Sequence, residues 1–139
     1  MTYPFLFLNK KSNKKESLKE ASESAKTANI LMNVSEFQSI DEATKSLIAM
    51  SAAYDDLSKM QIIDKLNEVG NNYSISTSGA AEALQASASA LRTAGNDMDE
   101  ALALVTAGNQ IVQDVSKAGN GLRTIALRLT GKQMCPNIE

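Results

Sequence analysis

The chain has 139 residues, of which 43% are hydrophobic, so it is the size of one ordinary domain with enough apolar residues for a core. Residues 1–20 carry five lysines against two glutamates (+3), and the rest carries nine basic against fourteen acidic residues (−5), so a duplex-binding face is not expected. A single cysteine, Cys135, excludes an intrachain disulfide framework, and the apolar stretch at residues 5–8 is too short to span a membrane.

The only run of basic residues, Lys10 to Lys15, has two interpretations. A basic arm could bind nucleic acid or a membrane surface. A solvated and poorly ordered tail is the more common meaning of such a run, however. We therefore expect residues 1–14 to form a disordered N-terminal tail.

Apolar residues first recur at helical spacing between residues 15 and 32, in the stripe Leu18, Ala21, Ala25, Ala28 and Met32. A capping-box pattern of Ser39 and Glu42 then precedes a second apolar series. Another such pattern, Ser58 with Gln61, opens a third helical segment. We expect Gly70 to end this segment in a left-handed C-cap.

All seven glycines lie in the second half of the chain, where they are expected to separate helices. A polar loop is predicted at residues 71–79, followed by a helical period that ends at Gly95. Asn96 or Asp97 can cap the next helix, and the last candidate begins near Ser116. Since no segment alternates as a strand would, we expect an all-α domain. It should have four to five short helices in a loosely packed or elongated bundle.

From Ser74 onward the interior is expected to be aliphatic and rich in alanine, because all six aromatic residues lie in the first 73 residues. Alanine buries little area, so helices built on it gain less from packing than leucine-rich ones and often depend on neighbouring chains. We expect marginal stability for the isolated chain. The faces on which helices pack together, or onto sister chains, are predicted to contain Leu66, Val69, Leu84, Leu91, Val105, Leu122 and Ile125.

Histidine is absent, which removes the commonest general base and metal ligand and the Ser-His and Cys-His nucleophile pairs. Carboxylates at Asp55 and Asp56, and at residues 97–100, could serve hydrolysis or bind a cation, but helix ends favour acids for structural reasons. The segment from Gly119 to Gly121 lacks the strand and the lysine of a phosphate loop. We therefore expect no enzymatic activity and no catalytic, cofactor or metal site.

Three blocks follow one another between residues 33 and 132. They are Ile63 to Asn71; then Ala83 to Gln85, Ser89 to Leu91 and Ala94 to Asn96; and finally Ala101, Thr106 to Asn109, Val112 to Asp114, Gly121 to Thr124 and Leu127 to Leu129. In composition, order and spacing the blocks resemble the conserved core region of phage tail tape measure proteins of Gram-positive siphophages and prophages. Residues 1–14 are unlike that family. The family usually has a proline where this chain has Val115, so we expect a softer break between the last two helices.

The resemblance implies a structural protein that is elongated, helical and self-associating. Such a protein is threaded through the virion tail after assembly in the host cytoplasm, with tail tube and tail assembly chaperone proteins as partners. It implies a helical core region at residues 15–132 between tails at 1–14 and 133–139. Since a fully helical chain of this length spans at most on the order of 200 Å, we expect a fragment of a longer ruler. The alternatives are a generic helical protein-binding module or adaptor without a viral role, and a helical cell-wall hydrolase. Neither a nucleic-acid site nor a membrane segment is expected.

Overall fold

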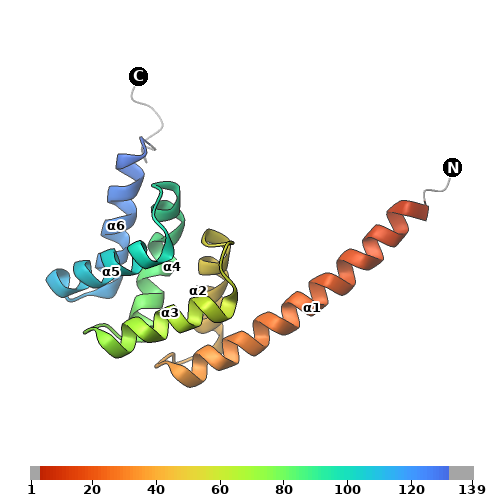
Figure 1. Ribbon diagram of the computed structural model, residues 1–139, viewed down its shortest axis with the longest axis horizontal. Coiled ribbons are helices and arrows are strands. Elements are labelled where there is room, and N and C mark those ends of the chain that lie inside the picture. The colour runs from red at the N-terminus through yellow and green to blue at the C-terminus, as the bar shows by residue number, and fades with distance from the viewer. Residues whose placement is uncertain (1–3, 132–139) are drawn as a thin grey trace.

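The computed structural model describes residues 4–131, and over that range it is built from helices alone (Figure 1). They are α1 (Pro4–Val34), α2 (Ile40–Ala53), α3 (Lys59–Asn72), α4 (Thr77–Thr93), α5 (Met98–Val112) and α6 (Val115–Leu129). The predicted all-α class is confirmed. The predicted count of four to five helices is too low, because each polar cap between the apolar segments begins a separate helix.

α1 is longer than the sequence pattern predicted. It begins at Pro4 and not near Lys15, so residues 4–14 continue the helix where a tail was expected. Proline is well tolerated in the first turn, where its missing N–H would have no helical partner, and no further proline interrupts the segment. The predicted tail at residues 133–139, with Cys135, lies outside the described residues.

Polar side chains fix where five of the described helices begin. Ser39 and Ser58 each accept a hydrogen bond from a backbone N–H in the first turn, as predicted, and Ser58 belongs to a complete capping box with Gln61. Ser76 and Asp97 have the same role before α4 and α5. Because such a cap satisfies a backbone donor that the helix leaves without a partner, these residues account for the sharp starts.

Gly70 does not end α3, contrary to the prediction. The helix continues to Asn72, and the backbone of Gly70 is not left-handed. The residue is small for a different reason: a Cβ at this position would lie 2.9 Å from the backbone nitrogen of Thr77. The start of α4 therefore passes close beside α3, and the predicted loop over residues 71–79 is reduced to residues 73–76.

Left-handed residues mark the two breaks around α5. Gly95 (φ +97°) ends α4, as predicted, because glycine adopts this conformation without steric cost. Gln113 (φ 53°) ends α5, and Asp114 caps α6 immediately afterwards. The break before Val115 is thus sharp. The prediction of a softer break is wrong, since a left-handed residue followed by a cap turns the chain without a proline.

The core surrounds α4, which contacts α2, α3, α5 and α6 (Figure 1). Its buried face consists mainly of small side chains and includes the leucines Leu84 and Leu91. Larger side chains from the other helices complete the core, and the fully buried ones are Leu31, Leu47, Met50, Tyr54, Ile62, Leu66, Met98 and Val105. The expected alanine-rich interior is therefore present along α4, while the largest side chains come from its neighbours.

Small residues allow α4 and α6 to lie very close together. A Cβ at Gly119 would lie 2.7 Å from the carbonyl oxygen of Ala83 and 2.9 Å from its Cα. Four residues earlier on each helix, a Cβ at Gly79 would lie 3.1 Å from Cγ1 of Val115. Since both contacts advance in the same direction along the chain, the two helices run parallel, as Figure 1 shows.

The N-terminal part of α1 leaves the body of the molecule. Thr27, Ala28 and Leu31 are buried against the other helices, whereas almost every residue from 15 to 26 is exposed, including Leu18 at 64%. Figure 1 shows this half of the helix extending away from α2 and α3. We call residues 15–26 the arm. Within the described range, no helix combines the length and the apolar character needed to cross a membrane.

Candidate interaction surfaces

The seven residues predicted to form packing faces have three different environments. Leu66, Leu84, Leu91 and Val105 are buried in the core. Val69 and Leu122 are partly buried and pack against it. Ile125 is 56% exposed on α6, on a face that no other described helix covers. The core thus brings six of these side chains together and leaves Ile125 at the surface.

A groove lies between α3 and α5, with a volume of about 450 Å³. Its apolar lining comes from Val69 on α3 and from Leu102, Ala103 and Ala107 on α5. Tyr73, which follows α3 directly, lines one end and is 57% exposed. These apolar and aromatic side chains, with charged residues around them, are a composition common in binding surfaces.

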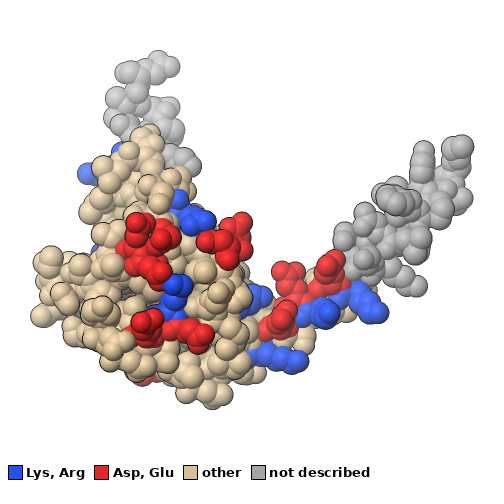
Figure 2. Space-filling model, viewed as in Figure 1, with Lys and Arg blue, Asp and Glu red and all other residues tan. Residues whose placement is uncertain are grey.

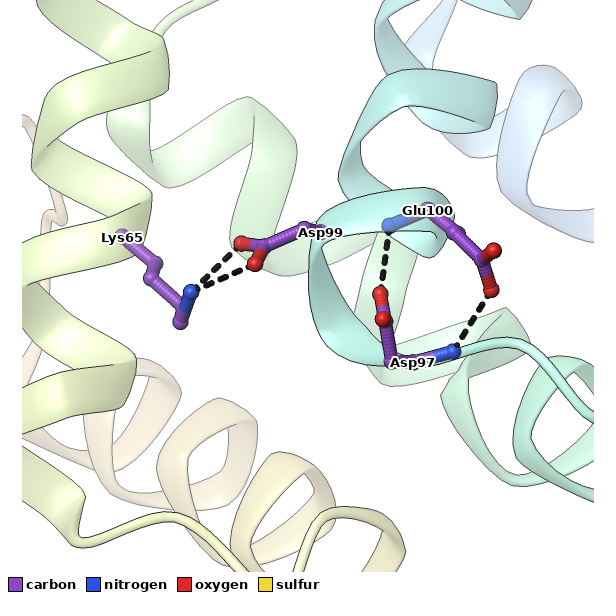
Figure 3. Close-up of polar contacts among 4 residues, drawn as sticks. All are labelled: Lys65, Asp97, Asp99 and Glu100. Carbon is purple, nitrogen blue, oxygen red and sulfur yellow. Dashed lines mark hydrogen bonds and ion pairs between the residues drawn. The ribbon is translucent and has the colours of Figure 1, made fainter.

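Figure 3 shows how the charged residues beside this groove are held. Nζ of Lys65 on α3 lies 2.6 Å and 2.7 Å from the two carboxylate oxygens of Asp99 on α5, so this ion pair bridges the groove at one end. Asp97 and Glu100 face the other way and form the capping box of α5. An exposed pair of this kind contributes about 0–1 kcal/mol to stability, so it orients the two helices more than it holds them together.

Four of the five carboxylates considered in the sequence as possible sites, all except Asp55, have structural partners among the described residues. Asp97 accepts from the backbone N–H of Glu100, Glu100 accepts from the backbone N–H of Asp97, and Asp99 pairs with Lys65. Asp56 pairs with Arg92 at 3.2 Å. No cluster of three or more metal-ligating side chains is found among residues whose placement is described. Asp97 and Glu100 thus have a structural role in the capping box of α5.

Tyr54 is a feature that sequence reasoning recognised only as an apolar position. Its ring is fully buried at the end of α2, and the guanidinium carbon of Arg92 lies 5.8 Å from the ring centroid. Among the described groups, the hydroxyl has no hydrogen-bond partner. Burial raises the pKa of Tyr54 to about 12, and the charge of Arg92 opposes this rise. The spacing of Tyr54 and Arg92 in the sequence gave no signal of this contact.

A second exposed apolar surface lies along the outer side of α6, and one further exposed apolar residue lies at the end of α5. Ile111 is 85% exposed and Leu129 is 79% exposed. Ile125 lies one helical turn before Leu129 on the same side of α6. Isolated apolar side chains such as Ile111 are common on protein surfaces, but Ile125 and Leu129 share one side of α6 and form a second candidate for contact with another molecule.

No protein-family model matches the chain, and no solved structure matches its fold. The function is therefore argued from the sequence resemblance and from the surfaces described above.

Proposed function

We propose that this chain is a structural, non-enzymatic part of a phage or prophage tail tape measure protein, the ruler around which a tail tube assembles. The observation that carries the proposal is the resemblance of three blocks between residues 33 and 132 to the core region of that family. The blocks agree in order and spacing as well as in composition, and together they run from Ile63 to Leu129.

The blocks lie on the helices that form the body of the molecule. The first block lies on α3, the second covers most of α4 and the turn after it, and the third covers α5 and α6. They contain residues on which packing depends, such as the buried Leu66 and Leu84 and the left-handed Gly95.

On this proposal the protein acts through its length and its contacts. It self-associates, its partners are tail tube and tail assembly chaperone proteins, and it works in the virion tail after assembly in the host cytoplasm. The described helices suit such a role, because they present exposed apolar side chains and a groove for other helices.

The test has two stages. Particles induced from the source strain would first be purified and analysed by mass spectrometry for peptides of this chain. An in-frame duplication of residues 59–131 would then be introduced, and tail lengths measured by electron microscopy. A ruler predicts tails longer by up to about 110 Å, at ~1.5 Å per helical residue. A synonymous recoding of the same segment is the control. Particles without these peptides, and tails of unchanged length, would refute the proposal.

The second candidate is a helical protein-binding module without a viral role, and the groove between α3 and α5 is the observation that favours it. Grooves lined by apolar side chains are a common docking site for amphipathic helices. This function predicts a single cellular protein that co-purifies with the chain in stoichiometric amount, and no peptides of the chain in particles.

A further inference from the structure

We propose that the groove between α3 and α5 receives the arm of a second copy of this chain, so that copies join head to tail. The inference concerns how two chains recognise each other. It goes beyond the tape measure proposal and does not depend on it.

The body supports the arm along one side only, where Ser24 accepts a hydrogen bond from Lys59 and Glu20 lines a shallow pocket with Ile48. Nearly all residues of the arm are exposed, and a helix of this length is marginal in water without tertiary packing. Lys15, Leu18 and Lys19 stand three and four residues apart, so they share one side of α1. This side offers one large apolar side chain, 64% exposed, between two basic ones.

The groove complements this side in shape and in polarity. Val69 and Leu102 provide an apolar lining, and the exposed Ala103 and Ala107 leave room for a large side chain such as leucine. Tyr73 at the rim can contact both an aliphatic stem and an ammonium group. The volume of about 450 Å³ accommodates several side chains of a docked helix.

Charge also favours this occupant. Over the whole arm three lysines balance three glutamates, but Lys15 and Lys19 lie beside Leu18 on one side of the helix, so the complementary charge is local to that side. At the groove, Glu68 forms no ion pair with any described residue, and the Asp99 side chain remains 68% exposed although it is paired with Lys65. These two carboxylates can receive Lys15 and Lys19. Figure 2 shows acidic side chains gathered on this face of the body, and both acidic and basic ones along the arm.

The arm of a chain cannot fill the groove of the same chain. α1 is one continuous helix, and Figure 1 shows it running away from the side of α3 on which α5 lies. The contact therefore joins two copies through different surfaces. Such a contact leaves one arm and one groove unoccupied in a dimer, and further copies can add at both ends.

Two single variants disable the two surfaces separately. Leu18→Asp removes the apolar anchor of the arm, and Ala107→Trp fills the groove from an exposed position on α5. Ile111→Asp is the matched control, because it adds the same charge at an apolar side chain that is 85% exposed and outside the groove. Circular dichroism of each full-length variant verifies the fold, and sedimentation velocity over a series of concentrations measures association.

We expect the wild-type chain and the Ile111→Asp variant to associate as concentration rises, and less so at high salt, whereas Leu18→Asp and Ala107→Trp stay monomeric. An equimolar mixture of these two variants should form heterodimers and nothing larger, because one partner retains a groove and the other an arm. Wild-type chains that stay monomeric at all concentrations would overturn the inference. Undiminished association of Ala107→Trp, loss of association in Ile111→Asp, or a mixture that does not associate would do so as well.

Discussion

The close crossing of α4 and α6 predicts opposite outcomes for two glycines that lie two residues apart in the same helix. A Cβ at Gly119 would approach backbone atoms of Ala83 at 2.7–2.9 Å, whereas a Cβ at Gly121 would meet no atom within 4 Å. Both positions lie in the interior of α6, so replacement by alanine gives both the same gain in helix propensity. That gain is about 1 kcal/mol for each.

Gly121→Ala should therefore stabilise the protein by about 0.5–1 kcal/mol. Gly119→Ala has the same gain but must also push apart two helix backbones, and overpacking of this kind costs about 1–3 kcal/mol. Because the propensity terms cancel, the difference between the two variants measures the cost of the crossing. This difference in stability corresponds to thermal unfolding midpoints that differ by roughly 4–12 °C, because each kcal/mol shifts the midpoint by roughly 4 °C in a chain of this size.

Thermal unfolding followed by circular dichroism at 222 nm measures both midpoints, with urea titration as a second readout of the free energy of unfolding. If the two alanine variants were equally stabilised, α4 and α6 would not approach as closely as Gly119 and Ala83 indicate. If both variants were equally destabilised, Gly121 would also contact a neighbouring helix, and the description of its position as exposed would be wrong. Either result would refute the packing described for this pair of helices.

Three further predictions concern side chains in the body. Leu84→Asp places an unpaired charge at a fully buried position, where truncation to alanine alone costs about 2–5 kcal/mol. We expect helicity or assembly to be lost. An unchanged circular dichroism spectrum and an unchanged oligomer size would contradict this. Tyr54→Phe removes a buried hydroxyl without a partner and should leave stability unchanged or raise it by about 1 kcal/mol. The wild type, but not this variant, should lose stability from about pH 10 to about pH 12, because the unfolded tyrosine ionises first. The backbone hydrogen bond from Lys117 lowers the pKa of Asp114 below its ordinary value of 3.8. Ionised Asp114 therefore stabilises the fold fully above pH 3.8, and this stabilisation is lost as the pH falls through the lowered pKa. Asp114→Asn keeps a cap acceptor and should flatten that acid dependence in urea titrations between pH 2 and 5.

The sequence was informative wherever a short local pattern determines the backbone. Ser58 with Gln61 and Asp97 with Glu100 form capping boxes, and each requires only residues three apart. Gly95 ends α4 for an equally local reason, since its φ of +97° favours glycine. The all-α class followed from these signals and from the spacing of apolar residues.

Tertiary contacts explain where the sequence failed. The sequence around Gly70 is typical of a C-cap, but the residue lacks a side chain because the backbone of Thr77 lies close beside it. Local spacing cannot reveal a contact of this kind. Gln113 adopts a left-handed backbone although it is neither glycine nor asparagine, the residues that usually signal this conformation in a sequence. The ion pair of Lys65 with Asp99 joins residues on different helices, and nothing in either local sequence indicates the other. The groove could not be predicted for the same reason.

The arm and the body differ in what stabilises them. In the body, small residues along α4 bring neighbouring helices close, so that many weak contacts replace the large buried areas of a leucine-rich core. The arm has few such contacts, among them the hydrogen bond from Lys59 to Ser24, although Leu18 gives it an apolar anchor. A helix that is held only at one end gains stability when a partner covers its exposed side, because binding to the folded form alone shifts the equilibrium towards it. The stability of the arm should therefore depend on the concentration of partners, whereas that of the body should not.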